Sequence, residues 1–258
     1  MTSSLRRILS SGIALAVAFC LCIFLVGCSA SDEEGEDYSL AKEGVLSVAA
    51  SLDDPPFSSL EAKEAAGFSV ALAKEVAHRM GLGCEIVDTS RDECASKVMS
   101  GACDIALPLE SLDAPRDEGL DVSDPFVVVD QAIIAKEGVY DSADDLKGRK
   151  IAVVKGSTGE RIAVDVVQGD AVEYESVEKC FAALKSGAVS AVVSDVPVAE
   201  KCAFATGCAV VERVATGERF GFLVGKDDPA LRSSIDEVLS LMEEDGSLDA
   251  LRKEYLGL

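Results

Sequence analysis

Short apolar runs of strand length alternate along the chain with longer stretches in which apolar residues recur at helical spacing. The runs that predict strands cover Val45–Ala50, Cys84–Val87, Ile105–Leu107, Ile151–Val154, Ala171–Tyr174 and Val189–Val193. The stretches that predict helices cover Gly67–Met80, Asp92–Ser100, Ser176–Lys185, Pro229–Met242 and Ser247–Tyr255. Because strands that alternate with helices form βαβ units, this pattern predicts an α/β fold.

Two further apolar strands interrupt the alternation. One is the β-branched run that follows Phe126, and the other covers Glu218–Lys226. We interpret them as crossings between two lobes, and two lobes joined by two strands can close about a hinge. The predicted boundaries are residues 44–129 and 218–258 for a discontinuous first lobe, and residues 130–217 for the second.

The amino-terminal residues predict export. Arg6 and Arg7 precede Gly12–Val26, an apolar run of 15 residues, which is shorter than the ~20 residues that span a bilayer as a helix. Leu25–Cys28 resembles the bacterial lipoprotein cleavage box, so we predict a signal peptide over residues 1–27 and a lipid on Cys28; an uncleaved anchor is the alternative. Residues 28–43 are acidic, lack apolar periodicity and predict a flexible tether.

Composition narrows the function. The net charge of −22 opposes binding to nucleic acid. The only histidine, His78, lies on a predicted helix face beside charged residues. Ser-His-Asp, Cys-His and multi-histidine metal chemistry are therefore not expected, and neither is a cofactor or metal site.

Cysteines are consistent with an oxidising compartment. Cys202 and Cys208 flank a short turn and predict a disulfide. The remaining cysteines of the exported part are further bridges or buried apolar residues, and their connectivity stays open: Cys84, Cys94, Cys103 and Cys180.

Three places carry candidate binding chemistry. Pro108 is expected to stop the ladder of the strand before it, so Ser111 and Arg116 should lie on a loop at the strand's carboxyl end, where ligands of open α/β sheets bind. Both are donors suited to a carboxylate. Ser157 with Glu160 has capping-box spacing and opens a helix whose free N–H groups can bind an anion or simply be capped.

The third place precedes another helix. Asp195 stands before Pro197, an arrangement that by itself is typical of a capped helix start.

The register of several motifs resembles that of the bacterial extracellular solute-binding proteins of family 3, the polar amino-acid receptors of ABC importers. The resemblance covers about Gly44 to Leu258. It rests on Asp104, Ser111, Arg116, Ser123, Asp124, Pro125 and Phe126, and on Phe220, Gly221, Lys226, Pro229, Leu231, Tyr255, Leu256 and Gly257. It implies a two-lobed, type II periplasmic-binding-protein-like fold with two hinge crossings.

The resemblance also implies roles for the candidate residues. Ser111 and Arg116 would hold the ligand carboxylate, with the Gly156–Thr158 turn gripping it from the second lobe, and Asp195 would take the ligand ammonium. Asp54 and Arg91 replace the family's two stacking aromatics, so the ligand side chain is expected to be polar or charged; a plain ion pair or a solvated turn aspartate are the alternatives. The ligand-binding set is thus Ser111, Arg116, Ser157, Thr158, Asp195, Asp54, Arg91 and Leu109.

The sequence therefore predicts a lipid-anchored, monomeric, extracytoplasmic amino-acid receptor that serves ABC permease subunits. One alternative is an enzyme that resembles cyclohexadienyl dehydratases, which share the fold. The other is a detached ligand-sensing domain.

Overall fold

The computed structural model describes residues 38–111 and 116–258, except for the side chains of residues 108–110, 204 and 205. The predicted signal peptide, Cys28 and the first part of the predicted tether lie outside the described residues. No helix within the described ranges is long and apolar enough to cross a membrane.

The main sheet of the described residues has the strand order β10-β9-β11-β8-β12-β6-β1-β5, and β7 pairs with β12. Its strands are β1 (Val45–Ala50), β5 (Gly83–Asp88), β6 (Ile105–Ser111), β7 (Leu120–Val122), β8 (Val127–Lys136), β9 (Lys150–Val154), β10 (Asp170–Tyr174), β11 (Ala191–Asp195) and β12 (Cys208–Gly225). Parallel pairs join β1 to β5 and β6, and β9 to β10 and β11. These are the two sets of βαβ units that the apolar pattern predicts.

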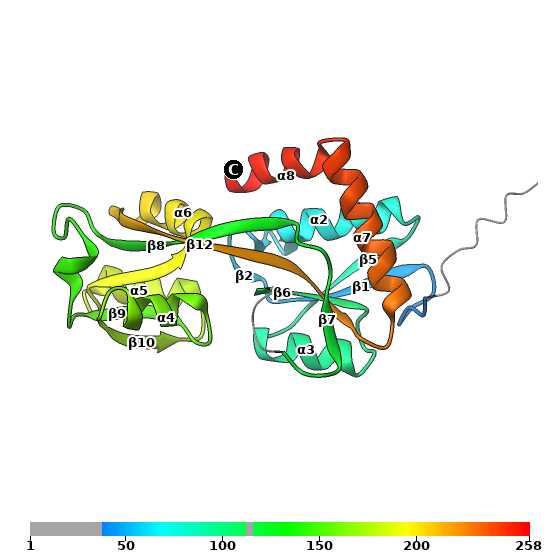
Figure 1. Cartoon of the computed structure of the whole chain (residues 1–258), viewed down its shortest axis with the longest axis horizontal. Coiled ribbons are helices and arrows are strands. Elements are labelled where there is room, and N and C mark those ends of the chain that lie inside the picture. The colour runs from blue at the N-terminus through cyan, green and yellow to red at the C-terminus, as the bar shows by residue number, and fades with distance from the viewer. Residues whose placement is uncertain (1–37, 112–115) are drawn as a thin grey trace, which may run out of the picture. The chain divides into compact units, whose positions relative to one another are not determined.

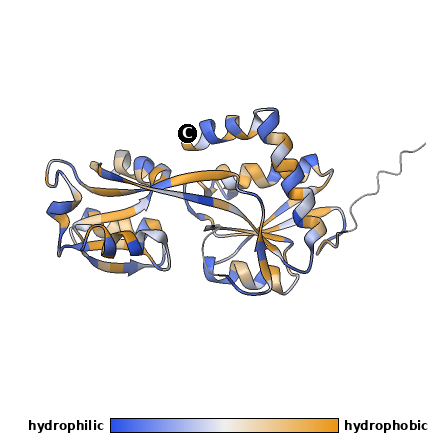
Figure 2. Ribbon diagram, viewed as in Figure 1, coloured by the Kyte–Doolittle hydropathy of each residue, from blue (hydrophilic) through white to orange (hydrophobic). Residues whose placement is uncertain are grey.

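Helices cover both sets of strands, as Figure 1 shows. They are α2 (Phe68–Arg79), α3 (Arg91–Met99), α4 (Thr158–Asp165), α5 (Val177–Ser186), α6 (Val196–Thr206), α7 (Pro229–Glu244) and α8 (Ser247–Leu256), with the short 3-10 helix η1 at Ala143–Leu146. The strands of the sheet are largely hydrophobic, whereas the helices show hydrophobic and hydrophilic segments in turn (Figure 2). That contrast is expected for sheets buried between amphipathic helices.

Two long strands join the two lobes. β8 and β12 pair antiparallel from Lys136 and Cys208 to Val127 and Phe220. On the way, β8 also pairs with β11 of the second lobe, and β12 with β6 of the first. The predicted crossings are therefore confirmed, and Figure 1 shows both strands running between the two groups of strands.

Phenylalanines fill the core where the crossings enter the first lobe. Phe57, Phe68, Phe126 and Phe222 are fully buried. The rings of Phe126 and Phe222 have centroids 4.7 Å apart, and those of Phe68 and Phe126 lie 6.0 Å apart. Each such pair adds about 0.5–1.5 kcal/mol beyond its burial. The crossings therefore begin from a rigid base.

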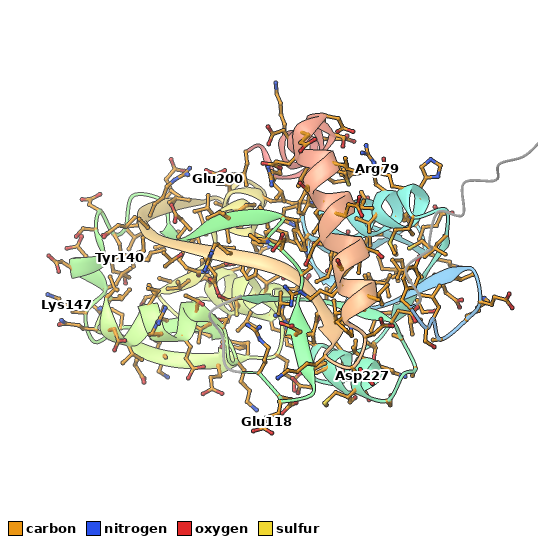
Figure 3. All side chains as sticks on the ribbon, turned by 45° about the vertical axis from the view of Figure 1, so that its right-hand side comes forward. Arg79, Glu118, Tyr140, Lys147, Glu200 and Asp227 are labelled. Carbon is orange, nitrogen blue, oxygen red and sulfur yellow. The ribbon has the colours of Figure 1, made fainter. Side chains whose placement is uncertain are left out.

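Arg79 ties the carboxyl-terminal helices to α2. It donates to Glu75 at 2.8 Å and to Asp245 at 2.7 Å, and its Nη2 atom donates to the Ser247 hydroxyl at 2.9 Å. Figure 3 labels Arg79 beside α7. Asp245 lies just before α8 and Ser247 is its first residue. The guanidinium of Arg79 therefore fixes the turn between α7 and α8.

The strand that contains Pro108 does not end where the sequence predicts. The pairing of β6 with β1 stops at Leu107, but β6 continues to Ser111 along β12. The register shifts between Gly221 and Leu223 on β12, and such an irregularity accommodates a residue that lacks a backbone donor. Ser111 thus lies on a strand rather than on a loop.

The end of the predicted tether is folded against the first lobe. The backbone N–H of Ala41 donates to Asp104 at 2.7 Å, and that of Ser39 donates to Asp228 at 3.1 Å. Tyr38 and Leu40 also pack on the core. The prediction of a flexible tether is therefore wrong for these last residues, because two carboxylates capture backbone donors that the sequence pattern does not reveal.

The sequence also misses one small sheet. A three-stranded antiparallel sheet is formed by the strands β2 (Asp53–Asp54), β3 (Ser58–Glu61) and β4 (Glu64–Ala66). Its strands are short and partly exposed, so they lack a clear apolar period. This sheet carries Asp54 and leads into α2.

Candidate functional site

Asp195 stands at the amino terminus of α6, but its side chain does not cap the helix. Its carboxylate makes no cap hydrogen bond with α6. Instead, Oδ1 accepts a hydrogen bond from Nε2 of Gln131, the residue opposite Asp195 in the β8–β11 ladder. Of the two interpretations that the sequence allows, the capping one is wrong, and the carboxylate is turned toward the crossing strands.

A second carboxylate, Glu218, joins Asp195 through Gln131. Nε2 of Gln131 also donates to Glu218 Oε2 at 3.3 Å. The hydroxyl of Thr158 donates to Glu218 Oε1 at 2.6 Å. Thr158 is the first residue of α4, so the helix start predicted to bind an anion already holds one from β12.

The start of α4 is only partly built as predicted. Ser157 is the N-cap residue, but its side chain makes no cap hydrogen bond. Glu160 accepts from the Gly156 N–H at 3.1 Å rather than from Ser157. The Ser157 hydroxyl is therefore not used by the helix.

Asp54 and Arg91 reach the same place from the first lobe. Nη2 of Arg91 donates to Asp54 Oδ2 at 3.1 Å, which confirms the ion pair predicted as one alternative. Asp54 lies on β2, and β2 packs against α5 of the second lobe. The pair is thus at the meeting of the two lobes.

The electrostatics show that these groups form one cluster. Burial, aided by the charges of Asp54 and Glu218, raises the pKa of Asp195 to about 8, against the lowering influence of Arg91 and of the Gln131 hydrogen bond. Burial likewise raises the pKa of Asp54, although Arg91 opposes it. Near neutral pH the cluster therefore favours binding a proton or another cation.

Ser111 and Arg116 lie beside the same crossing strand. Ser111 pairs with Phe220 on β12, two residues after Glu218. Nη2 of Arg116 donates to the Ser111 carbonyl oxygen at 3.3 Å, and both side chains are half-buried. That Arg116 faces Asp195 across a shared cleft stays a prediction, as does the role of Leu109, whose side chain lies outside the description.

Sequence reasoning did not find Glu218 and Gln131. Gln131 is the one amide in the apolar run after Phe126, and it is 2% exposed. A buried polar residue in a crossing strand is a signal that could have identified it. Glu218 carries no such signal, since it opens the predicted strand Glu218–Lys226 beside another charged residue, Arg219.

The described residues also contain a pocket away from this cluster. It has a volume of about 400 Å³ and lies between the Ser39–Ala41 segment, α3 and the turn before α7. Asp227, one of its lining residues, is labelled in Figure 3. None of the predicted ligand-binding residues lines it, so we do not assign the ligand to it.

The predicted disulfide is not formed. Cys202 and Cys208 are both free thiols. Cys202 belongs to α6, whereas Cys208 begins β12, with its Sγ atom 3.9 Å from the Thr206 carbonyl oxygen. Their closeness in sequence therefore does not lead to a bond between the two thiols. No described cysteine is bridged, and the described residues contain no group of three His, Cys, Asp or Glu side chains suited to a metal ion.

Comparisons with known proteins extend this picture. The model of the bacterial extracellular solute-binding proteins, family 3, matches residues 46–258. The lysine/arginine/ornithine-binding periplasmic protein of Escherichia coli (strain K12) is 27% identical over 216 residues, which cover 78% of this chain and 83% of that protein.

Two solved structures show the same fold. An ancestral arginine-binding protein bound to glutamine has a TM-score of 0.74 at 30% identity, covering 84% of this chain and 100% of the other. An ancestral amino acid-binding protein, named as a precursor of cyclohexadienyl dehydratase, has a TM-score of 0.75 at 30% identity, covering 83% and 96%. These matches confirm the two-lobed, type II periplasmic-binding-protein fold.

Proposed function

We propose that this chain, which belongs to the bacterial extracellular solute-binding proteins of family 3, is the receptor of an ABC importer for an amino acid with a cationic side chain. The family makes it an amino-acid-binding protein outside the cytoplasm rather than an enzyme. The similar precursor of cyclohexadienyl dehydratase is itself an amino acid-binding protein, so the dehydratase alternative gains no support from it.

The charge of the cluster carries the proposal for the ligand. When ionised, Asp54, Asp195 and Glu218 bring three negative charges to one place. Arg91 brings one positive charge. A ligand ammonium leaves one negative charge unmatched, and its carboxylate is neutralised by Arg116. A cationic side chain supplies the missing charge, whereas a neutral side chain leaves a buried carboxylate that must keep a proton.

The names of some of the similar proteins support this assignment. The Escherichia coli protein is named for lysine, arginine and ornithine, and the two ancestral structures are named for arginine and for amino acids. In this chain Asp54 stands where the resembling family has a stacking aromatic. We propose that Asp54 meets the side-chain cation, because its Oδ2 atom already binds a guanidinium.

Ligand contacts on both lobes explain how binding closes the protein. Arg116 and Asp54 belong to the predicted first lobe, and Thr158 and Asp195 to the second. A ligand held by both favours the closed form by the difference in contacts between the two forms. Two or three charge-assisted hydrogen bonds, less the cost of ordering, correspond to about −8 kcal/mol and micromolar affinity.

The proposal also includes the lobe boundaries, the signal peptide over residues 1–27, the lipid on Cys28 and the monomeric state. A charged n-region, a short apolar run and a small residue before Cys28 support lipidation. Mass spectrometry of the membrane fraction tests it: a diacylglyceryl group on Cys28 is expected, and an intact residue 27–28 bond contradicts it.

Calorimetric titration of the purified protein with the twenty common amino acids and ornithine tests the ligand. We expect arginine, lysine or ornithine to bind most tightly. Tighter binding of a neutral or acidic amino acid contradicts the charge argument while leaving the receptor role intact. No binding to any of them contradicts the receptor role itself.

A further inference from the structure

The side chain of Gln131 leaves one strong acceptor without a partner inside the cluster. Its Oε1 atom is buried and accepts no hydrogen bond from the described residues. When Asp195 and Glu218 are ionised, as they are with a ligand ammonium bound, both carboxylates only accept, so Nε2 must donate to them and Oε1 cannot take its place. Burying an amide oxygen without a donor is costly, so a donor from a ligand is favoured there.

Further acceptor capacity lies next to Oε1. Within the described residues, no group donates to Asp195 Oδ2. The Glu218 carboxylate accepts one hydrogen bond on each oxygen, from Thr158 and Gln131, and each carboxylate oxygen can accept two. Two carboxylates and one amide oxygen therefore gather in one place, and an ammonium group has three N–H donors to offer them.

The backbone directs Glu218 into this place. The β8–β12 register breaks between Val214 and Glu218. The N–H groups of Thr216 and Gly217, within the break, both donate to Asp130 Oδ1, at 3.0 and 2.9 Å. A β-bulge of this kind re-aims the side chain that follows it. Glu218 is the next residue, so we attribute the orientation of its side chain to this break in the strand.

From these contacts we propose that Glu218 and Gln131 bind the α-ammonium group of the ligand together with Asp195. The ammonium then donates to one acceptor from each of three strands, β12, β8 and β11. This inference rests on the proposed function, since it assumes an amino acid as the ligand. It adds two residues on the crossing strands to those that the sequence assigned, and it makes the crossings themselves part of the binding site.

The first experiment compares the parent protein with the variants Glu218→Gln and Gln131→Met. Glu218→Gln keeps the size of the side chain and the acceptor for Thr158, but removes the charge. The probe is the amino acid of the panel that binds most tightly. By calorimetry we expect each variant to weaken binding by about tenfold to hundredfold, the worth of one charge-assisted hydrogen bond. The exposed Glu212 on the same strand provides the matched control, Glu212→Gln, which keeps the parent affinity.

The second experiment removes the ammonium from the ligand instead of the acceptor from the protein. The probe is the same amino acid without its α-amino group, which for arginine is guanidinopentanoate, measured by competition. If Glu218 binds the ammonium, Glu218→Gln leaves the affinity for this analogue within about twofold of the parent. If Glu218 has only a structural role, Glu218→Gln weakens the binding of the amino acid and of its analogue by the same factor, and the proposal is overturned.

Failure of the inference is distinct from failure of the proposed function. If the parent binds an amino acid and both Glu218→Gln and Gln131→Met retain the parent affinity, the three-acceptor arrangement is rejected and the receptor role stands. If the parent binds no amino acid, the proposed function is rejected and the inference with it. Melting curves of both variants show whether they fold; should Gln131→Met not fold, the Glu218→Gln result alone decides.

Discussion

Replacing Asp195 by Asn is expected to stabilise the ligand-free protein. The half-buried carboxyl of Asp195 lies near Asp54 and Glu218, and its pKa is about 8 in the folded chain. In the unfolded chain the same group has its ordinary pKa of 3.8. An Asn side chain has almost the same shape, carries no charge, and its Oδ1 atom can still accept the hydrogen bond of Gln131.

The size of the effect follows from the two pKa values. A raise from 3.8 to about 8 corresponds to at most about 6 kcal/mol of destabilisation once the folded carboxyl ionises. Because the surroundings of Asp195 relax when its charge is removed, we expect about 2–4 kcal/mol at pH 8. For a chain of this size that raises the melting temperature by about 5–15 °C.

The pH dependence identifies the cause. Between about pH 4 and pH 8 the folded state holds a proton on Asp195 that the unfolded state has lost. As the pH rises through this range, this group therefore lowers the stability of the parent by up to about 1.4 kcal/mol per pH unit. The contribution is fully present below the unfolded pKa and is gone above about pH 8. The variant lacks this slope.

Denaturant unfolding at about pH 5, 7 and 8.5 checks the expectation. The difference between Asp195→Asn and the parent should be small at the lowest pH and grow toward the highest. Asp170→Asn, at an exposed position on β10, is the control and should show no trend. An Asp195→Asn variant that is equally or less stable than the parent at pH 8.5 would refute the assignment of a strained, buried carboxyl.

Three more predictions follow from the site. Arg116→Ala should abolish detectable amino-acid binding in calorimetry while shifting the stability by less than about 1 kcal/mol, because the substitution falls at a half-buried position outside the helices and strands; binding at parental affinity would remove Arg116 from the site. Affinity for the ligand ammonium should rise with pH up to about 8, as Asp195 loses its proton, and a flat profile between pH 5 and 8 would contradict the role of Asp195. Thiol titration of the unfolded protein should find Cys202 and Cys208 reactive without prior reduction, whereas a reductant-dependent melting temperature would restore the disulfide.

Elements with a strong apolar period could be predicted from the sequence. The helix predicted over Pro229–Met242 is observed as Pro229–Glu244, with Asp228 accepting the Leu231 N–H at 2.9 Å. The run after Phe126 is observed as β8. In both cases local pattern and tertiary burial favour the same structure, which is the condition under which sequence reasoning succeeds.

Elements set by long-range partners could not. Ser39 and Ala41 are held by carboxylates far away in sequence, so nothing in the acidic segment itself indicates order. Pro108 stays in a strand because β12 has an irregular register opposite it. The pairing partner, rather than the residue, decides both outcomes.

The site divides in the same way. Asp54, Arg91, Thr158 and Asp195 were predicted from motif positions, and the structure brings all four to one cluster. Glu218 was missed because its importance comes from where the break in β12 directs it, and a bulge leaves little trace in the sequence. Gln131 was missed although its buried amide could have identified it.

The break in β12 also bears on how the protein moves. Elsewhere the two long strands hold each other by a ladder of backbone hydrogen bonds. Thr216 and Gly217 leave this ladder and donate to Asp130 instead, so we expect the rotation between the lobes to be concentrated there. Asp130 would then set the stiffness of the hinge. That stiffness would determine how much of the ligand's binding energy is used to bring the lobes together.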